Sequence, residues 1–167
     1  MKKKMKILII TTGGTIDKIY FDDMSKYEVG EPNIKHVLKN LKVNFDYQVK
    51  SLLKKDSLYM DNKDRKLIYD YISKSKYERI LITHGTDTMV ETGIFLKPLK
   101  NRIIVLTGSM QTASFINSDA VFNVGFALGA LQVLKKGVYI AMSGSIYDPS
   151  ESVKNREKGI FEKKNEI

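Results

Sequence analysis

Two short polar motifs carry the residues of this chain that could do chemistry. One reads Thr12-Gly13-Gly14-Thr15-Ile16-Asp17 and the other reads His84-Gly85-Thr86-Asp87-Thr88. A threonine hydroxyl is a weak nucleophile until a base removes its proton, and a lysine held in its neutral form can act as that base. A glycine pair next to a threonine also allows a turn that leaves backbone N–H groups open to a bound oxygen atom. These residue types are therefore suited to attack on a carbonyl group.

Each motif follows a short run of aliphatic residues, at 6–10 and 79–82. Runs of this kind that end in a glycine turn are typical of parallel strands buried on both faces. In open α/β sheets, ligands bind outside the carboxyl ends of the strands. The sequence therefore predicts that Thr15, Thr86 and Asp87 meet at one edge of a sheet.

The rest of the chain alternates between strand and helix patterns, which favours a mostly parallel sheet covered by helices. Further strands are expected over 45–52, 102–106 and 137–142, and helices over 32–41, 62–75, 88–96 and 118–134. The expected fold is a three-layer α/β sandwich of the Rossmann or flavodoxin type, with residues 1–167 as a single domain. The tail from residue 148 is charged and rich in turn residues.

Two segments have features of their own. The connection from Gly13 to Gly30 is long for a loop without structure, and such loops are usually functional lids or disordered. Its aromatic and aliphatic residues favour a lid, hinged at its terminal glycines. The helix expected over 118–134 contains small residues, which we expect to let it pack closely on the sheet: Gly125, Ala127, Gly129 and Ala130.

Composition limits the function classes. The chain has 167 residues, 43% hydrophobic residues and no cysteine, so disulfides, thiol catalysis and cysteine-bound metals are excluded. With only two histidines, neither a metal site nor a cofactor is expected, and His84 is interpreted as structural. The apolar run after the basic N-terminus is too short for an export signal, so a cytoplasmic protein is expected. The net charge of +9 comes from scattered lysines, which favours a solvated surface over a nucleic-acid face.

The pair of motifs resembles the bacterial-type L-asparaginase/glutaminase family. Thr-Gly-Gly-Thr-Ile is followed about seventy residues later by His-Gly-Thr-Asp-Thr, and the resemblance to the family's N-terminal domain covers essentially the whole chain. It implies an amidohydrolase that converts the side-chain amide of asparagine, or a related small amide, to the acid and ammonia. It also implies a threonine nucleophile and a homo-oligomer without a cofactor.

The resemblance assigns catalytic roles residue by residue. Thr15 matches the nucleophilic threonine, and Tyr27, in Tyr-Glu-Val-Gly, matches the lid tyrosine that assists it. Thr86 and Asp87 match the Thr-Asp pair of the second motif. Lys154, in Glu-Ser-Val-Lys, matches the catalytic lysine. The order in which the two threonines act stays open.

Substrate-binding roles follow in the same way. Ser57, in Asp-Ser-Leu-Tyr-Met, matches a substrate-binding serine, and Asp87 also binds the substrate. Gly14 and Gly85 are expected to offer backbone groups beside the threonines. Each assignment has a structural alternative: the threonines and Asp87 could start helices, Ser57 could be a turn residue, Tyr27 could pack, and Lys154 could be solvated.

The chain also departs from the family pattern. Leu58 and Tyr59 stand where the family has polar residues, and the family's second domain, which completes the pocket from a neighbouring subunit, is expected to be absent. We therefore expect a homodimer with weak or relaxed amidase activity and an exposed apolar face around the lid and the segment after the fifth strand. Two alternatives remain: a non-catalytic amino-acid-binding module, and the amidase component of an RNA-dependent amidotransferase. A dinucleotide site is disfavoured because Gly-x-Gly-x-x-Gly is missing.

Overall fold

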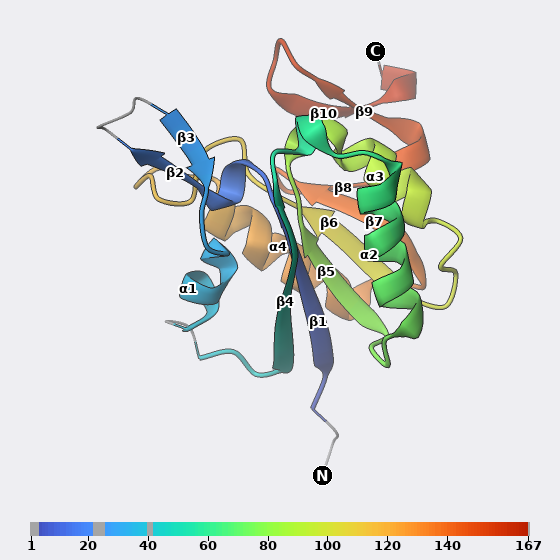
Figure 1. Cartoon of the computed structure of the whole chain (residues 1–167). Helices are drawn as coiled ribbons and strands as arrows, with labels where there is room; N and C mark the ends of the chain where they lie inside the picture. The colour runs from blue at the N-terminus through green and yellow to red at the C-terminus, as the bar shows by residue number, and fades with distance from the viewer. Residues whose placement is uncertain (1–3, 22–25, 40–41, 167) are drawn as a thin grey trace.

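A computed structural model describes residues 4–21, 26–39 and 42–166 of the chain. Its centre is a six-stranded sheet in the order β4-β1-β5-β6-β7-β8 (Figure 1). The first five strands in this order run parallel, and β8 pairs antiparallel with β7. The mostly parallel sheet is confirmed, and its strands are β1 Lys6–Gly13, β4 Asp46–Lys55, β5 Arg79–Thr83, β6 Ile103–Thr107, β7 Gly137–Met142 and β8 Ser145–Tyr147.

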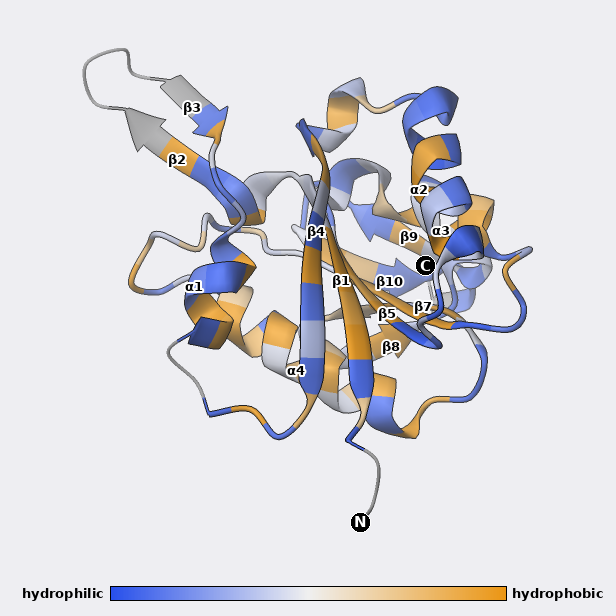
Figure 2. Cartoon of the chain, turned by 60° about the horizontal axis from the view of Figure 1, so that its bottom comes forward, coloured by the Kyte–Doolittle hydropathy of each residue, from blue (hydrophilic) through white to orange (hydrophobic). Residues whose placement is uncertain are grey.

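Helices cover both faces of the sheet. On one face lie α1 (Asn33–Lys39) and α4 (Ala120–Val133), and on the other lie α2 (Asn62–Lys74) and α3 (Met89–Leu96) (Figures 1 and 2). This confirms the three-layer α/β architecture. Within the part of the chain that the structure describes, no helix is both long and apolar enough to cross a bilayer.

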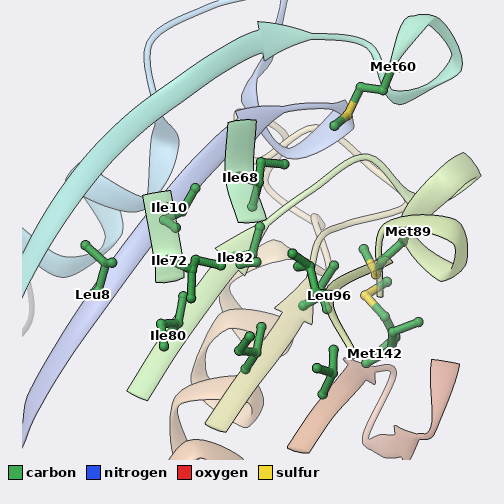
Figure 3. Packing of buried hydrophobic residues seen from close by; sticks show 14 of the residues in the cluster. Leu8, Ile10, Met60, Ile68, Ile72, Ile80, Ile82, Met89, Leu96 and Met142 are labelled. Atoms are coloured by element: carbon green, nitrogen blue, oxygen red, sulfur yellow. The ribbon is translucent and has the colours of Figure 1, made fainter. Parts of the chain in front are cut away.

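The apolar runs fill two cores. In β1, Leu8 and Ile10 pack on the side of α2 and α3, whereas Ile7 and Ile9 pack on the side of α1 and α4. Successive residues of a strand point to opposite faces of the sheet. A strand that helices cover on both faces therefore carries apolar side chains at nearly every position. Figure 3 shows the first core, in which β1 and β5 face Ile68 and Ile72 of α2 and Leu96 of α3.

The strand order places the two motifs together. Taken in chain order, the parallel strands lie as 2-1-3-4-5, the flavodoxin-type arrangement. The direction of winding reverses between β1 and β5, and the crevice at such a reversal is where doubly wound folds bind ligands. The motif at Thr12–Asp17 ends β1 and the motif at His84–Thr88 follows β5. Both therefore stand at the carboxyl ends of the two strands that flank this crevice.

Two segments are more regular than the sequence suggested. The connection from Gly13 to Gly30 is not an unstructured loop: it holds a 3₁₀ turn at Thr15–Asp17 and an antiparallel hairpin of β2 (Lys18–Phe21) and β3 (Lys26–Val29). The charged tail likewise forms a hairpin, β9 (Ser152–Asn155) with β10 (Ile160–Lys163). Both hairpins lie at the end of the sheet where the motifs meet (Figure 1).

The expectation for the small residues of α4 is wrong for its two glycines. Ala127 and Ala130 are buried against the sheet, as expected, but Gly125 and Gly129 are exposed. A Cβ atom added at either glycine would meet no atom within 4 Å. Gly125 and Gly129 lie four residues apart and therefore share one face of the helix, and this face differs from the one that carries the buried Ala127 and Ala130.

Candidate active site

The loops after β1 and β5 touch each other through their glycines. Gly14 has a φ of 89°, which favours glycine, and a Cβ atom placed there would lie 2.4 Å from the Cα atom of Gly85. No side chain fits at this approach. Because Thr15 and Thr86 directly follow these glycines, their loops form a single surface at the crevice.

A third loop joins them at Ser57, which begins the 3₁₀ turn Ser57–Tyr59. A Cβ atom on Gly85 would lie 2.4 Å from Ser57 Oγ, so the glycine again allows the contact. Thr88 Oγ1 donates a hydrogen bond of 2.8 Å to the Ser57 carbonyl oxygen. Ser57 Oγ is buried and has no hydrogen-bond partner among the described residues. An unpaired buried hydroxyl is costly, so this atom is a candidate for binding a ligand oxygen.

Lys154 connects the tail hairpin to the second motif. Its Nζ donates hydrogen bonds of 2.7 Å to Thr86 Oγ1 and 2.8 Å to Asp87 Oδ1. Pairing of β9 with β10 places Lys154 opposite Phe161, whose buried side chain anchors the hairpin in the core. The lysine side chain is only 14% exposed, and Arg156 Nε lies 3.8 Å from the same Asp87 oxygen. This lysine is therefore not a solvated surface residue.

The threonines do not act as helix caps. The 3₁₀ turn at Thr86–Thr88 begins after Gly85 without a side-chain cap, and the turn at Thr15–Asp17 begins after Gly14 without one. Thr86 uses its hydroxyl to accept from Lys154 instead. The cap interpretation is therefore not supported for either residue.

Thr15 is half-buried and differs from Thr86 in its surroundings. Its hydroxyl has no hydrogen-bond partner among the residues that the structure describes. It lines a hollow of about 230 Å³ together with Lys18, Met110, Gln111, Thr112 and Phe115. Asp119 fixes the Met110 and Gln111 side of this hollow, because its carboxylate accepts hydrogen bonds from the backbone N–H groups of these two residues.

His84 has the structural position that the sequence indicated. Its Nδ1–H donates to the Gly85 carbonyl at 2.7 Å, and its Nε2 accepts from Thr92 Oγ1 at 2.9 Å. Complete burial lowers the pKa of His84 to about 4, which keeps the ring neutral near pH 7. The hydrogen bond of the buried ring therefore fixes the position of the Gly85 carbonyl group.

Tyr27 lies in β3, opposite Tyr20 of β2. Its side chain falls outside the described part of the chain. The assignment of this residue stays a prediction.

Sequence reasoning missed two polar residues next to Thr15. Asp17 is buried, accepts a 2.8 Å hydrogen bond from the backbone N–H of Asn33, and burial raises its pKa to about 6. Lys18 forms a 2.6 Å ion pair with Asp56, which ties the start of β2 to the Ser57 loop. Asp17 belongs to the first motif and could have been noticed, whereas no local pattern links Lys18 to Asp56.

Larger hollows lie elsewhere in the molecule. Two of them, of about 500 and 560 Å³, adjoin Lys76 and Tyr77 at the amino ends of the strands. They contain none of the residues of the two motifs. Chemistry in this class of sheet occurs at the carboxyl ends, so we take the smaller hollow at Thr15 as the candidate active site.

Known asparaginases resemble the chain over nearly its whole length. The family model described as "Asparaginase, N-terminal" matches residues 6–163. The L-asparaginase of Thermococcus kodakarensis is 30% identical over 148 residues, which span 85% of this chain and 45% of that protein. A solved structure of the thermostable L-asparaginase from the same organism superposes with a TM-score of 0.84 at 28% identity, covering 95% of this chain and 51% of that one.

A second kind of relative shares a shorter region. A glutamyl-tRNA(Gln) amidotransferase component of Methanococcus vannielii is 36% identical over 85 residues, or 50% of this chain and 19% of that protein. In each case the chain spans about half or less of the length of the relatives that it matches. With the family model matching nearly all of its residues, the chain belongs to the asparaginase family and corresponds to that family's N-terminal region.

Proposed function

We propose that the chain is an amidohydrolase that hydrolyses the side-chain amide of L-asparagine, or a related small amide, through a threonine nucleophile. The observation that carries this proposal is the contact of 2.7 Å between Lys154 Nζ and Thr86 Oγ1, in a nearly buried setting beside Asp87. A hydroxyl, an amine and a carboxylate in this arrangement form a proton-transfer unit. Membership of the asparaginase family supports an amide as the substrate of this chain.

The proposed reaction is acyl transfer in two steps. Thr15 Oγ attacks the amide carbon with the assistance of Tyr27, the C–N bond breaks, and the Thr15 hydroxyl proton is relayed through the Thr86–Lys154 pair to the nitrogen, which leaves as ammonia. Water then attacks the ester carbon and the bond to Thr15 Oγ breaks. A proton of that water is relayed through the same pair back to Thr15 Oγ, which restores the hydroxyl and releases the acid. Thr15 suits the first role because its hydroxyl has no partner among the described residues and the residue lines the hollow.

Binding of the substrate is assigned to the surrounding loops. Asp87 would hold the α-amino group, and Ser57 Oγ, which lacks a partner among the described residues, would donate to the α-carboxylate. Backbone groups at Gly14 and Gly85, which form the touching loops, would lie beside the developing oxyanion. The hollow of about 230 Å³ is lined by Thr15 but not by Ser57 or Asp87, and it is smaller than the roughly 300–1,000 Å³ usual for drug-sized ligands.

An ammonia-release assay on asparagine, glutamine and simple amides tests the proposal. We expect release from asparagine by the unaltered chain and loss of at least about 10³-fold in kcat for Thr15→Ala and for Thr86→Val. Circular dichroism establishes that both variants are folded. Near-normal hydrolysis by both variants would contradict the assignment. Tight aspartate binding without any turnover would favour an amino-acid-binding module instead.

The similarity to an amidotransferase component supports a second candidate, an amidase that feeds ammonia to an RNA-dependent partner. Besides that similarity, the net charge of +9 is compatible with tRNA. A tRNA affinity that falls steeply with salt concentration would support this function, because release of counterions from phosphates has that signature. Absence of tRNA binding at about 50 mM salt, where such contacts are strong, would leave only the free amidase.

A further inference from the structure

The end of the sheet at which its parallel strands begin is strongly basic. Five short segments lie at the starts of these strands, at 4–6, 42–46, 74–79, 100–102 and 135–136. Together they contain ten lysines and arginines but only two acids, Asp46 and Glu78. They therefore carry +8 of the net charge of +9, and we call them the basic edge. In the sequence these cations are scattered, which favoured a solvated surface, but the fold brings them to one end of the molecule.

The pairing of the strands sets the segments of the basic edge side by side. Arg79 of β5 lies opposite Ile7 of β1 and Ile103 of β6, and Ile103 lies opposite Gly137 of β7. On the other side, Lys6 of β1 lies opposite the first residue of β4. Neighbouring strands are about 4.8 Å apart, so the five strands spread the cations over roughly 20 Å. In Figure 2 this end of the sheet comes forward, and the starts of β1 and β4 are hydrophilic.

Ion pairs neutralise little of this charge. Among the described residues the basic edge forms two of them, Lys4 with Asp46 at 3.9 Å and Arg79 with Glu78 at 3.4 Å. The other eight cations have no carboxylate partner in the described part of the chain. Like charges gathered in this way repel one another and destabilise the compact state. The concentration of charge therefore opposes folding unless an anion binds there.

Helix dipoles account for only part of the cluster. Lys74 lies in the last turn of α2, where a cation offsets the negative end of the helix dipole. Lys4, Lys6 and Lys76 lie instead just before or at the start of a strand, where no such stabilisation is available. These lysines are all exposed. They are therefore free to bind a ligand from solution.

Two hollows open at the basic edge and share Lys76 and Tyr77. One, of about 500 Å³, is also lined by Tyr71 and Lys74, and the other, of about 560 Å³, is also lined by Lys6. Both volumes fall in the range of roughly 300–1,000 Å³ that is usual for small-molecule sites. Aromatic rings beside ammonium groups are the combination with which proteins hold an unpaired base and its phosphates.

We propose that the basic edge binds a single-stranded nucleic acid, with backbone phosphates on its lysines and an unpaired base in the hollow beside Tyr77. Phosphates relieve the repulsion between the lysines and release counterions when they bind. The position of the aromatic residues favours this partner over an anionic membrane. Tyr71 and Tyr77 are only partly exposed and line hollows, whereas a bilayer surface is bound by apolar side chains that project into it.

The basic edge and the candidate active site lie at opposite ends of the sheet. Both threonine motifs follow the carboxyl ends of β1 and β5, so a strand bound at the amino ends leaves the hollow at Thr15 open. Binding at the basic edge goes beyond the proposed amidase activity and does not depend on it. Ammonia release and nucleic-acid binding are therefore measured separately, and either can fail without the other.

Fluorescence anisotropy with a labelled oligouridine of about 12 nucleotides tests the proposal between about 50 and 200 mM salt. About four phosphate contacts should make the logarithm of Kd rise with the logarithm of salt concentration with a slope of about 3. Lys74→Gln/Lys76→Gln should weaken binding by at least about 10-fold at 50 mM salt and lower this slope by about 1.4. The matched control is Lys63→Gln/Lys66→Gln, which makes the same charge change nearer the other end of α2 and should alter neither value.

A second variant tests for the base. Tyr77→Leu keeps an apolar side chain but removes the ring, so binding should weaken by about 10-fold while the salt slope stays the same. Circular dichroism establishes that each variant is folded. The proposal is overturned if the unaltered chain does not bind the oligouridine at about 50 mM salt, or if the two double-lysine variants bind equally. It is also overturned if Tyr77→Leu binds normally, or if vesicles of anionic lipid bind where the oligouridine does not.

Discussion

The loops that follow β1 and β5 carry similar glycine and threonine residues, and hydrogen bonds hold both loops, but the hydroxyl groups of Thr15 and Thr86 differ in their surroundings. After β5, His84 bonds to the Gly85 carbonyl, Thr86 and Asp87 bond to Lys154, and Thr88 bonds to the Ser57 carbonyl. After β1, Thr15 has a hydroxyl without a partner among the described residues and lines a hollow.

This difference suggests a division of labour within the proposed site. Proton-transfer groups work best when they are held in place before the substrate arrives, because no free energy is then spent on ordering them. A nucleophile must instead have its lone pair free for the carbonyl carbon. We therefore assign proton transfer to Thr86, which Lys154 holds, and attack to Thr15, whose hydroxyl has no partner among the described residues.

Besides the two threonine variants, the largest effect is expected when the amine of Lys154 is removed. Lys154→Met keeps most of the side-chain volume but removes the donor to Thr86 and Asp87, so kcat should fall by about 10²–10⁴-fold, the usual contribution of general acid–base catalysis. The matched control is Lys158→Met, which removes the ion pair with Glu162 in the same hairpin and should leave kcat unchanged. Equal activity of the two variants in the ammonia assay would contradict the role of Lys154.

Forcing the two loops apart should have the next largest effect. Gly14→Ala places a Cβ atom 2.4 Å from Gly85 at a φ of 89°, so both stability and activity should fall, the former by about 1–3 kcal/mol. Gly159→Ala separates the two causes, since its φ is 65° but nothing lies within 4 Å of the added atom. Denaturant unfolding and kcat of both variants would be compared. If Gly159→Ala lowers stability and kcat as much as Gly14→Ala does, the contact between the two loops does not explain the effect of Gly14→Ala.

The β5 loop should lose stability in acid because of His84. The pKa of His84 is lowered to about 4 by burial, from an ordinary value of 6.5, so the unfolded chain binds a proton that the folded chain excludes. The contribution of this residue is therefore present above pH 6.5 and is lost as the pH falls through about 4, on the order of 3 kcal/mol in total. Unfolding measured from pH 7 to 4 should show this slope, and His84→Gln should lack it.

Asp17, beside the β1 loop, should have the opposite dependence. Burial raises its pKa to about 6 from 3.8, so the folded chain binds the extra proton. The stabilising contribution is complete below pH 3.8 and is lost as the pH rises through about 6. In Asp17→Asn the amide oxygen can still accept from Asn33, and the variant should gain stability relative to the unaltered chain at pH 7, measured by urea unfolding. A variant that is less stable at pH 7 would count against the burial argument.

The strands that lead into the two loops could be predicted from the sequence, whereas the hairpins around the site could not. β1 and β5 were predictable because a strand buried on both faces must be a continuous apolar run that ends at a turn. The β2–β3 and β9–β10 hairpins were not, since short strands at the rim of the sheet are mixed with lysines and acids. The family resemblance, and not spacing, pointed to Lys154, which lies 68 positions from Thr86.

Two further features could not be predicted from the sequence. They are the ion pairs between residues far apart in the chain and the side of α4 that faces the sheet. The ion pair of Lys18 with Asp56 joins residues whose neighbours give no sign of it. In α4, small residues occur on both faces, so composition alone could not show that the alanines are covered and the glycines are exposed. Tertiary contacts decide both features.

The most direct test of the assignment is to find which threonine carries the acyl group. The chain would be mixed with excess asparagine, or with an activated ester of the same acyl group, quenched in acid and digested for peptide mapping by mass spectrometry. The assignment predicts an acyl adduct on the peptide that contains Thr15, absent from Thr15→Ala and retained in Thr86→Val. An adduct on Thr86 would contradict it, because the residue held by Lys154 would then be the nucleophile.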